Sequence, residues 1–256
     1  MNKQVAVGPE FVVVQGIRLE VREWAGQGTP ILMLHEGLGS VAMWRDFPSR
    51  LAAATGRHVI AWSRRGYGHS ERLPASRDPD YMHREADTVP ALMDALGLDQ
   101  AVLFGHSDGA SIALIAAARY PERVAALILE APHVYVEQLT VDSIAQAKTT
   151  YRTTDLGRRL GRYHADADHA FWGWNDIWLD PRFRDWNIEE LLPAIGAPAL
   201  LIQGLDDEYG TLDQLDRIEA VLPRTRRLAL TACAHSPHRD QPQAVLQASA
   251  SFLDDL

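Results

Sequence analysis

Short apolar runs and longer amphipathic segments alternate along the chain. Five runs are almost uniformly apolar: Ile31–Leu34, Val59–Trp62, Ala101–Phe104, Ala125–Leu129 and Ala199–Ile202. Runs of this kind predict strands that are buried on both faces, as in a parallel sheet. Helix-like segments separate or follow them at Trp44–Ala54, Arg84–Leu96, Ala110–Arg119 and Leu212–Val221. This alternation predicts βαβ units and an α/β fold with an open, mostly parallel, doubly wound sheet.

The two ends of the chain add a hairpin and a helix to this plan. Phe11–Val14 and Arg18–Trp24 flank Gln15-Gly16, a pattern typical of two antiparallel strands joined by a tight turn. Pro242–Leu253 is expected to form a C-terminal helix.

One long stretch interrupts the alternation. From Glu137 to Leu192 no run resembles a strand, and the composition turns towards Trp, Arg, His and Asp. We predict a helical insertion, and in an open α/β sheet such an insertion lies over the carboxyl ends of the strands, where ligands bind. The predicted division is a core domain of residues 1–136 and 194–256 and a helical cap, or lid, of residues 137–193.

Composition and charge narrow the class of protein. With 256 residues, 46% hydrophobic and 23% charged, the chain is typical of a globular protein and unlike a disordered tail, a collagen or a coiled coil. The formal charge of -9 gives no electrostatic support to nucleic-acid binding. The single cysteine, Cys233, excludes a disulfide within one chain. No signal-peptide pattern or membrane-spanning apolar run is evident, so we expect a cytoplasmic protein with no membrane partner and a small-molecule substrate; the oligomeric state stays open.

The strongest local motif is Gly105-His106-Ser107-Asp108-Gly109, which follows one predicted strand and opens a helix rich in small residues. This is G-x-S-x-G in the context that the motif requires, with Ser107 at a sharp strand-to-helix turn. A serine hydroxyl becomes a nucleophile only when a base removes its proton, and that base needs an orienting carboxylate. We therefore expect an acid and then a histidine further along the chain.

Suitable candidates follow in that order. Asp206 and Asp207 come shortly after the predicted strand Ala199–Ile202, and His235 comes before the C-terminal helix. Glu130 is a third candidate acid, and His238 is expected to be a surface residue or to lie behind the site. The order Ser, Asp, His is the one found in α/β hydrolases.

Over residues 11–256 the chain resembles the α/β-hydrolase-fold serine hydrolases that carry a helical cap. In that family the acid usually follows its strand as G-x-x-D, which selects Asp207 when counted from Gly204. His235 stands where the family has the histidine of its G-H-x-x-x-x-x-x-P segment, with Ala234 in place of Gly. The resemblance implies a catalytic triad of Ser107, Asp207 and His235.

An oxyanion hole is expected from two backbone N–H groups. One belongs to Asp108, directly after the nucleophile. The resemblance of His35-Glu36-Gly37 to the family's H-G-x motif implies Gly37 as the second, with Glu36 as an alternative donor because it replaces the usual glycine. The segment Arg64-Arg65-Gly66-Tyr67-Gly68-His69-Ser70 resembles another family loop, and we interpret it as structural.

The predicted cap concentrates aromatic residues, among them Trp172, Trp174 and Trp178. They are expected either to line a pocket for an apolar or aromatic acyl group or to pack the cap onto the core. His164, Asp166, Asp168 and His169 lack the spacing of a helical zinc site and are expected to form a solvated polar turn, so we predict no metal and no cofactor.

Together these residues predict hydrolysis of a carboxylic ester, lactone or thioester through an acyl-enzyme. Carbon–carbon bond hydrolases of aromatic-degradation pathways are the nearest alternative, and a ligand-binding protein with slow turnover is a second. The carboxylates of Glu36 and Asp108 close to the expected oxyanion hole favour neutral substrates over free acids.

Overall fold

The structure is a computed structural model that describes residues 10–256. Residues 1–9 of the predicted core domain, with most of the N-terminal stretch considered for a signal peptide, lie outside the described part.

One sheet of eight strands organises the fold, in the order β1-β2-β4-β3-β5-β6-β7-β8. β1 pairs with β2 and β2 with β4 in antiparallel fashion, and all other neighbours are parallel. The fold class predicted from the alternating pattern is therefore confirmed. The strands are β1 (Glu10–Val14), β2 (Ile17–Trp24), β3 (Ile31–Leu34), β4 (Val59–Trp62), β5 (Ala101–His106), β6 (Val124–Glu130), β7 (Ala199–Gly204) and β8 (Thr225–Leu230).

Helices connect the strands, and several of them cover the two faces of the sheet. They are α1 (Phe47–Thr55), α2 (Tyr81–Ala95), α3 (Asp108–Arg119), α4 (Gln138–Thr153), α5 (Leu156–Leu160), α6 (Ala167–Trp178), α7 (Asp213–Glu219), α8 (Pro237–Asp240) and α9 (Pro242–Asp254). Short 3₁₀ turns are η1 (Val41–Trp44), η2 (Pro121–Arg123), η3 (Pro181–Phe183) and η4 (Glu189–Ala194).

The uniformly apolar strands are explained by the two layers of helices. In β3, Leu32 and Leu34 pack into the cluster that includes α2 and α3, whereas Ile31 and Met33 pack into the cluster that includes α1 and α9. Successive side chains of a strand point to opposite faces, so a strand covered on both faces has no polar positions.

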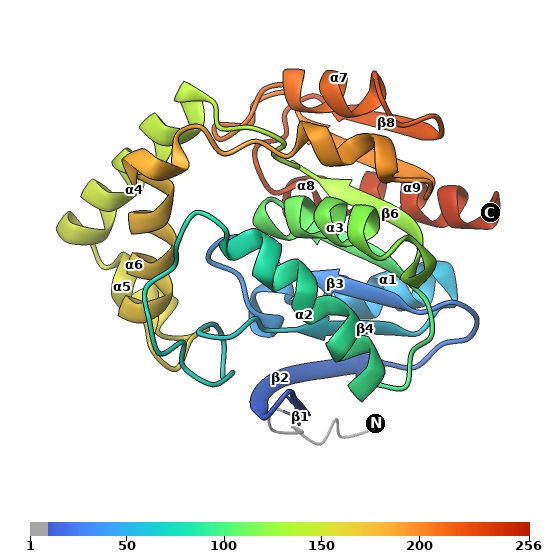
Figure 1. The fold of residues 1–256 in the computed structure, drawn as a ribbon, viewed down its shortest axis with the longest axis horizontal. Helices are drawn as coiled ribbons and strands as arrows, with labels where there is room; N and C mark the ends of the chain where they lie inside the picture. The colour runs from blue at the N-terminus through green and yellow to red at the C-terminus, as the bar shows by residue number, and fades with distance from the viewer. Residues whose placement is uncertain (1–9) are drawn as a thin grey trace.

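The long stretch between β6 and β7 is helical, as the pattern predicts. It contains α4, α5 and α6, here called the inserted helices, and then η3 and η4. Figure 1 shows the inserted helices grouped at one side of the molecule, away from α7 and α9. Between these helices and the core lies the cavity described below.

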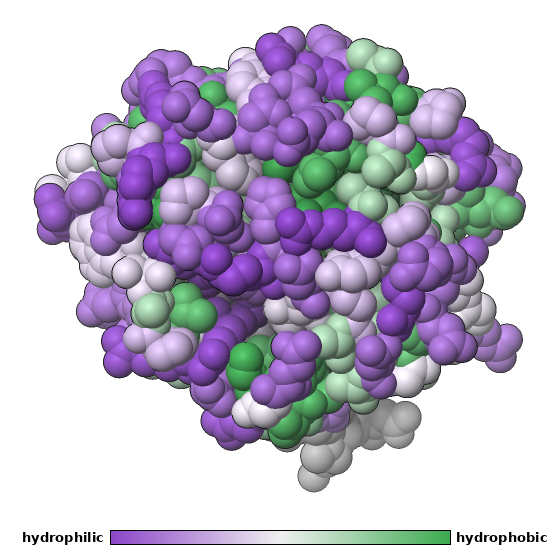
Figure 2. Space-filling model, in the orientation of Figure 1, coloured by the Kyte–Doolittle hydropathy of each residue, from purple (hydrophilic) through white to green (hydrophobic). Residues whose placement is uncertain are grey.

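Within residues 10–256, no helix has both the length and the apolar character needed to cross a membrane. The face drawn in Figure 2 is mostly hydrophilic, with hydrophobic residues scattered over it in small patches.

Candidate active site

Ser107 occupies a strained turn between β5 and α3. Its backbone has φ 54° and ψ -119°, in the left-handed region that costs a non-glycine residue of order 1–3 kcal/mol. Gly109 makes the turn possible, because a Cβ at this position would overlap the carbonyl oxygen of Leu34. The turn leaves the Ser107 side chain facing the carboxyl ends of the strands.

Three side chains from different loops meet at this point. Nε2 of His235 lies 2.9 Å from Oγ of Ser107. Nδ1 of the same ring lies 2.8 and 2.9 Å from the two carboxylate oxygens of Asp207. The loops after β5, β7 and β8 thus bring together the residues that the sequence singles out as nucleophile, acid and base.

Asp207 is held rigidly. Its carboxylate accepts hydrogen bonds from Gln203 Nε2 at 2.6 Å and from the Tyr209 amide at 2.8 Å. Burial alone would raise the pKa of Asp207, but the charge and hydrogen bond of His235 and the Tyr209 amide lower it below its ordinary value. The carboxylate is therefore ionised at neutral pH.

The rival acids lie elsewhere. Asp206 is exposed, and its amide donates to the carbonyl of Cys233. Glu130 accepts a hydrogen bond from Nδ1 of His238 at 2.7 Å, and both side chains are buried behind the site. His238 is thus not a surface residue.

Several backbone amides of the described residues have no hydrogen-bond partner and belong to residues that line the same cavity as Ser107. Within residues 10–256, the amides of Glu36, Gly37 and Asp108 donate no hydrogen bond, and all three residues line the cavity. The carbonyl of Glu36 accepts from Arg64 Nη2 at 2.8 Å and from His35 Nδ1 at 2.7 Å. Because a peptide unit is planar and trans, the Gly37 N–H points away from these donors.

This arrangement gives Arg64 a defined structural task. Besides orienting the Glu36–Gly37 peptide, its Nη1 lies 3.9 Å from the carboxylate of Asp108. Asp108 also accepts hydrogen bonds from Tyr81 at 2.7 Å and from the Trp178 indole at 3.2 Å. The Asp108 charge is therefore compensated by the protein, which weakens our expectation that it repels anionic substrates.

A cavity of about 280 Å³ opens over Ser107. Its inner wall carries Ser107, His133, Tyr209 and His235. The inserted helices supply most of the apolar wall, through Ile144, Ala147, Leu156, Phe171, Trp174 and Trp178. Among the described residues no lysine or arginine lines this cavity. Two arginines of the inserted helices point elsewhere: Arg152 stacks on Trp172, and Arg158 pairs with Asp155.

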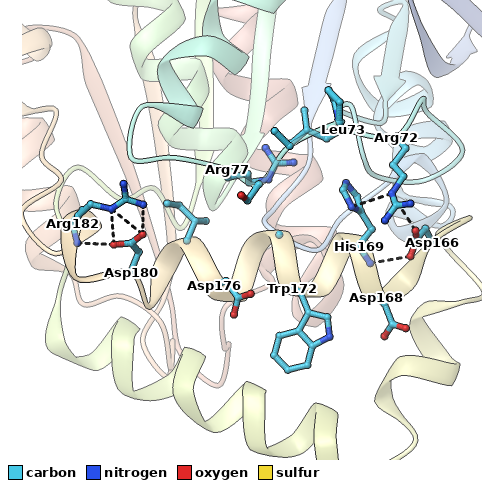
Figure 3. Close-up of a pocket in the computed structure, with 15 residues that line it drawn as sticks. Arg72, Leu73, Arg77, Asp166, Asp168, His169, Trp172, Asp176, Asp180 and Arg182 are labelled. Carbon is cyan, nitrogen blue, oxygen red and sulfur yellow. Dashed lines mark hydrogen bonds and ion pairs between the residues drawn. The ribbon is translucent and has the colours of Figure 1, made fainter.

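Trp172 does not reach this cavity, contrary to the sequence-based expectation. It packs against Tyr151 of α4 and borders a separate outer cavity of about 910 Å³. Figure 3 shows this outer cavity between α6 and the segment of Arg72 and Arg77, with the Trp172 ring turned away from both arginines. Its charges are largely paired internally, as in Arg72–Asp166 and Arg182–Asp180.

The predicted solvated polar turn is also not what the structure shows at His164. Its side chain is buried, with Nδ1 accepting from the Gly68 amide at 3.0 Å and Nε2 donating to the Leu38 carbonyl at 2.9 Å. Asp166 instead caps α6 by accepting from the His169 amide. These residues join loops and do not converge on one point.

Another polar cluster lies directly below the site. One side-chain nitrogen or oxygen atom from each of His106, Glu130 and His238 lies within 4.8 Å of the other two, and all three residues are buried. Nδ1 of His238 and one oxygen of Glu130 already bond each other, and Nε2 of His106 bonds the carbonyl of His235. These three side chains therefore already form hydrogen bonds within the protein.

Sequence reasoning does not single out His133 and Tyr209. Burial and the charge of His235 lower the pKa of His133 to about 3, and burial raises the pKa of Tyr209 to about 12. Both side chains are therefore neutral at physiological pH. Their position after β6 and β7, at the edge of the sheet that holds the site, is the signal that could have found them.

Comparison with known proteins places the chain in a family. Residues 29–167 match the model of the alpha/beta hydrolase fold. The human protein "Serine hydrolase BPHL" is 31% identical over 210 residues, which cover 77% of this chain and 69% of the relative. A 2-hydroxy-6-oxo-6-phenylhexa-2,4-dienoate hydrolase of Burkholderia cepacia is 25% identical over 90% of this chain and 89% of its own.

Solved structures agree with the fold. A thermophilic esterase from Thermogutta terrifontis superposes with a TM-score of 0.76 at 22% identity, over 97% of this chain and 99% of that one. The family-model match, the identity to the human relative and the sheet order lead to one conclusion: the chain belongs to the α/β-hydrolase fold family.

Proposed function

We propose that this α/β hydrolase is a serine hydrolase that cleaves a carboxylic ester, lactone or thioester of a small apolar or aromatic substrate through an acyl-enzyme. The observation that carries the proposal is the continuous hydrogen-bonded chain from Asp207 through His235 to Ser107, which ends in an apolar cavity. We further propose that residues 137–193 act as the cap over this cavity.

The geometry supports a definite division of labour. Asp207 accepts a hydrogen bond from the Nδ1–H of His235, so the lone pair of Nε2 faces the Ser107 hydroxyl. Nε2 takes the hydroxyl proton as Oγ attacks the carbonyl carbon of the substrate, and Asp207 stabilises the imidazolium that results. The same histidine then gives its proton to the leaving group and activates a water molecule that releases the acyl group.

The developing oxyanion needs donors that are already in place. The Asp108 amide stands at the first residue of α3, where helix N–H groups have no partner within the helix. The Gly37 amide is the second proposed donor, because Arg64 and His35 hold the carbonyl of the same peptide from the opposite side. Preorganised donors of this kind contribute about 10²–10³ each to kcat.

The cavity favours small, neutral acyl groups. Its volume of about 280 Å³ lies just below the usual range of ligand pockets, about 300–1,000 Å³. Trp174 and Trp178 present aromatic surface to it, and no lysine or arginine among the described lining residues is available to pair with a substrate carboxylate.

A time course with p-nitrophenyl acetate and p-nitrophenyl butyrate tests the proposal. We expect many product molecules per enzyme, and a fluorophosphonate probe should label Ser107, as detected by mass spectrometry of the peptide. Release of at most one equivalent of product would instead indicate a ligand-binding protein with slow turnover. Turnover without labelling of Ser107 would contradict the acyl-enzyme route.

A second candidate is carbon–carbon bond hydrolysis in a keto acid. The Burkholderia cepacia relative, named for a dienoate, favours it. The cavity wall counts against it, since a dienoate carries a carboxylate and no lysine or arginine lines the wall among the described residues. Turnover of a dienoate substrate by a protein that does not hydrolyse p-nitrophenyl esters would support this candidate.

The absence of a lysine or arginine from the described wall of the cavity predicts a substrate preference. Two p-nitrophenyl esters of succinic acid can be compared: one carries a methyl ester on its second carboxyl group and is neutral, and the other carries a free carboxylate. We expect KM to be lower for the neutral compound by about tenfold, the equivalent of about 1.4 kcal/mol. Steady-state kinetics at one ionic strength will measure the ratio. A lower KM for the anionic ester would contradict the prediction.

A further inference from the structure

His106, the residue before Ser107, is buried between two loops of the site. Its side chain is 1% exposed. On one side Nε2 lies 2.7 Å from the backbone carbonyl of His235, and on the other Nδ1 lies 3.6 Å from Oε2 of Glu36. One ring thus connects the loop of residues 35–40 to the loop that carries His235.

These two partners determine the protonation of the ring. A carbonyl oxygen can only accept, so Nε2 of His106 must carry a proton. A carboxylate also only accepts, and an unprotonated Nδ1 would turn its lone pair towards the charge of Glu36. Both contacts are favourable only when His106 is a doubly protonated imidazolium, paired with ionised Glu36.

The electrostatic surroundings agree with this assignment. Burial alone would lower the pKa of His106, but the Glu36 carboxylate 3.6 Å away and the charge of Glu130 raise it to about 9. Burial would likewise raise the pKa of Glu36, yet His106, with contributions from His35 and His238, holds it well below its usual range.

The other groups facing His106 come from three elements. Glu130 at the end of β6 is a second nearby anion, bonded to His238 of α8, whose ring lies 5.0 Å from that of His106. The ring of His235 lies 5.1 Å away, and His133 is neutral because its pKa is lowered. The nearby carboxylates are therefore the groups that stabilise a positive charge on His106.

We propose that His106 is a positioning residue. As an imidazolium bound to Glu36 and to the carbonyl of His235, it fixes the position of the 35–40 loop relative to the general base. The inference rests on the proposed function, since the two loops carry the proposed Gly37 oxyanion donor and the proposed base. Glu36 directly precedes Gly37, and the carbonyl that His106 holds belongs to His235 itself.

The role predicts an alkaline limit to activity. Loss of the proton from His106 removes the attraction to Glu36, so kcat should fall as pH rises through about 9. The same reasoning applies to stability: because the pKa is raised in the folded state, this contribution is complete below the unfolded value near 6.5 and is lost as pH rises through about 9.

The test is the dependence of kcat and KM on pH, from 6 to 10.5, for p-nitrophenyl butyrate hydrolysis. In H106N the alkaline fall should disappear, with kcat at neutral pH lower by about tenfold or more because a charge-assisted hydrogen bond is lost. In E36Q the midpoint of the fall should move down by about one pH unit or more, since an opposite charge is removed. An unchanged alkaline limb in both variants overturns the proposal.

A matched control separates charge from loop packing. His164 is also buried and bonds the 35–40 loop at the Leu38 carbonyl, but it does not contact Glu36 or His235. H164Q should lower activity without moving the midpoint. A midpoint shift in H164Q equal to that in E36Q would overturn the inference.

An NMR titration of the His106 imidazole in the wild-type protein requires no turnover. It therefore distinguishes failure of this inference from failure of the proposed function. A ring that stays doubly protonated up to about pH 9 supports the inference even if esters are not hydrolysed, whereas a neutral ring at pH 7 overturns it. H106N changes the residue next to Ser107 and can destabilise that turn. E36Q tests the same ion pair by changing its other member, Glu36.

Discussion

Replacement of Ser107 by alanine is expected to lower kcat for p-nitrophenyl butyrate by about 10⁵–10⁶, the size of effect seen when a serine nucleophile is removed. The alanine side chain has no oxygen to attack the ester, while the amides of Gly37 and Asp108 and the apolar wall stay in place. Binding should persist, so KM should change little. Initial rates and active-site titration of both proteins will measure the effect.

Ser111 provides a matched control for this variant. It lies one turn further along α3 and is also buried. Its hydroxyl donates to the His133 carbonyl at 2.7 Å and to the Ser107 carbonyl at 3.4 Å, and accepts from the His133 amide at 3.1 Å. Ser111→Ala removes these neutral hydrogen bonds but no reacting atom, so kcat should remain within about tenfold of the wild type. A similar loss in both variants would point to damage to the fold and contradict Ser107 as the nucleophile.

Asp207→Asn is expected to lower kcat by about 10⁴, because the asparagine amide can hold the His235 ring in the wrong tautomer. In the native site both carboxylate oxygens lie within 2.9 Å of Nδ1, which must therefore carry the proton. The loss should appear in kcat with little change in KM, and a pH profile of kcat will show whether the base still titrates.

The neighbouring aspartate makes this test unusually direct. Asp206 is exposed and contacts neither His235 nor Ser107, so Asp206→Asn should leave kcat within about twofold of the wild type. The two variants remove the same charge from adjacent positions. If Asp206→Asn caused the larger loss, the assignment of the acid would be overturned.

Much of the fold could be predicted because the central strands are buried on both faces. β3 and β4 occupy the same residues in the structure as in the predicted pattern, Ile31–Leu34 and Val59–Trp62. A strand covered by helices on both sides has only apolar positions, so its composition alone reveals it. The hairpin of β1 and β2 was predictable from Gln15-Gly16, both of which have positive φ.

Elements at the margins were harder to predict. β8, with the sequence TRRLAL, lies at the edge of the sheet, and its arginines are exposed, so it has no uniform apolar run. The helix expected from Trp44 begins only at Phe47, because Arg45 adopts φ 56° and separates η1 from α1. Neither feature leaves a clear trace in the hydrophobic pattern.

The candidate site shows a similar division. Ser107, Asp207 and His235 could be located because the motif fixes the serine and the chain order restricts the acid and the histidine to segments further along the chain. That Trp172 lies outside the cavity, unlike Trp174 and Trp178, could be predicted only once the bounds of α6 are known. Consecutive residues of a helix point about 100° apart around its axis, so Trp172 points away from the direction of its neighbour Phe171. The pairing of His106 with Glu36 depends on adjacent β3 and β5, and sequence alone does not specify which loop side chains meet there.

The hydrogen bond between Ser107 and His235 joins positions 128 residues apart, whereas His235 and Asp207 are separated by 28. Closing the longer loop requires β5, β6, β7 and β8 to be paired in order, and such non-local pairing is the slow part of folding. During refolding, helical structure can therefore return well before any catalysis does. The time at which activity returns would then mark the time at which the whole sheet has formed. The proposed ester hydrolysis would therefore report on the last long-range contacts to form during refolding.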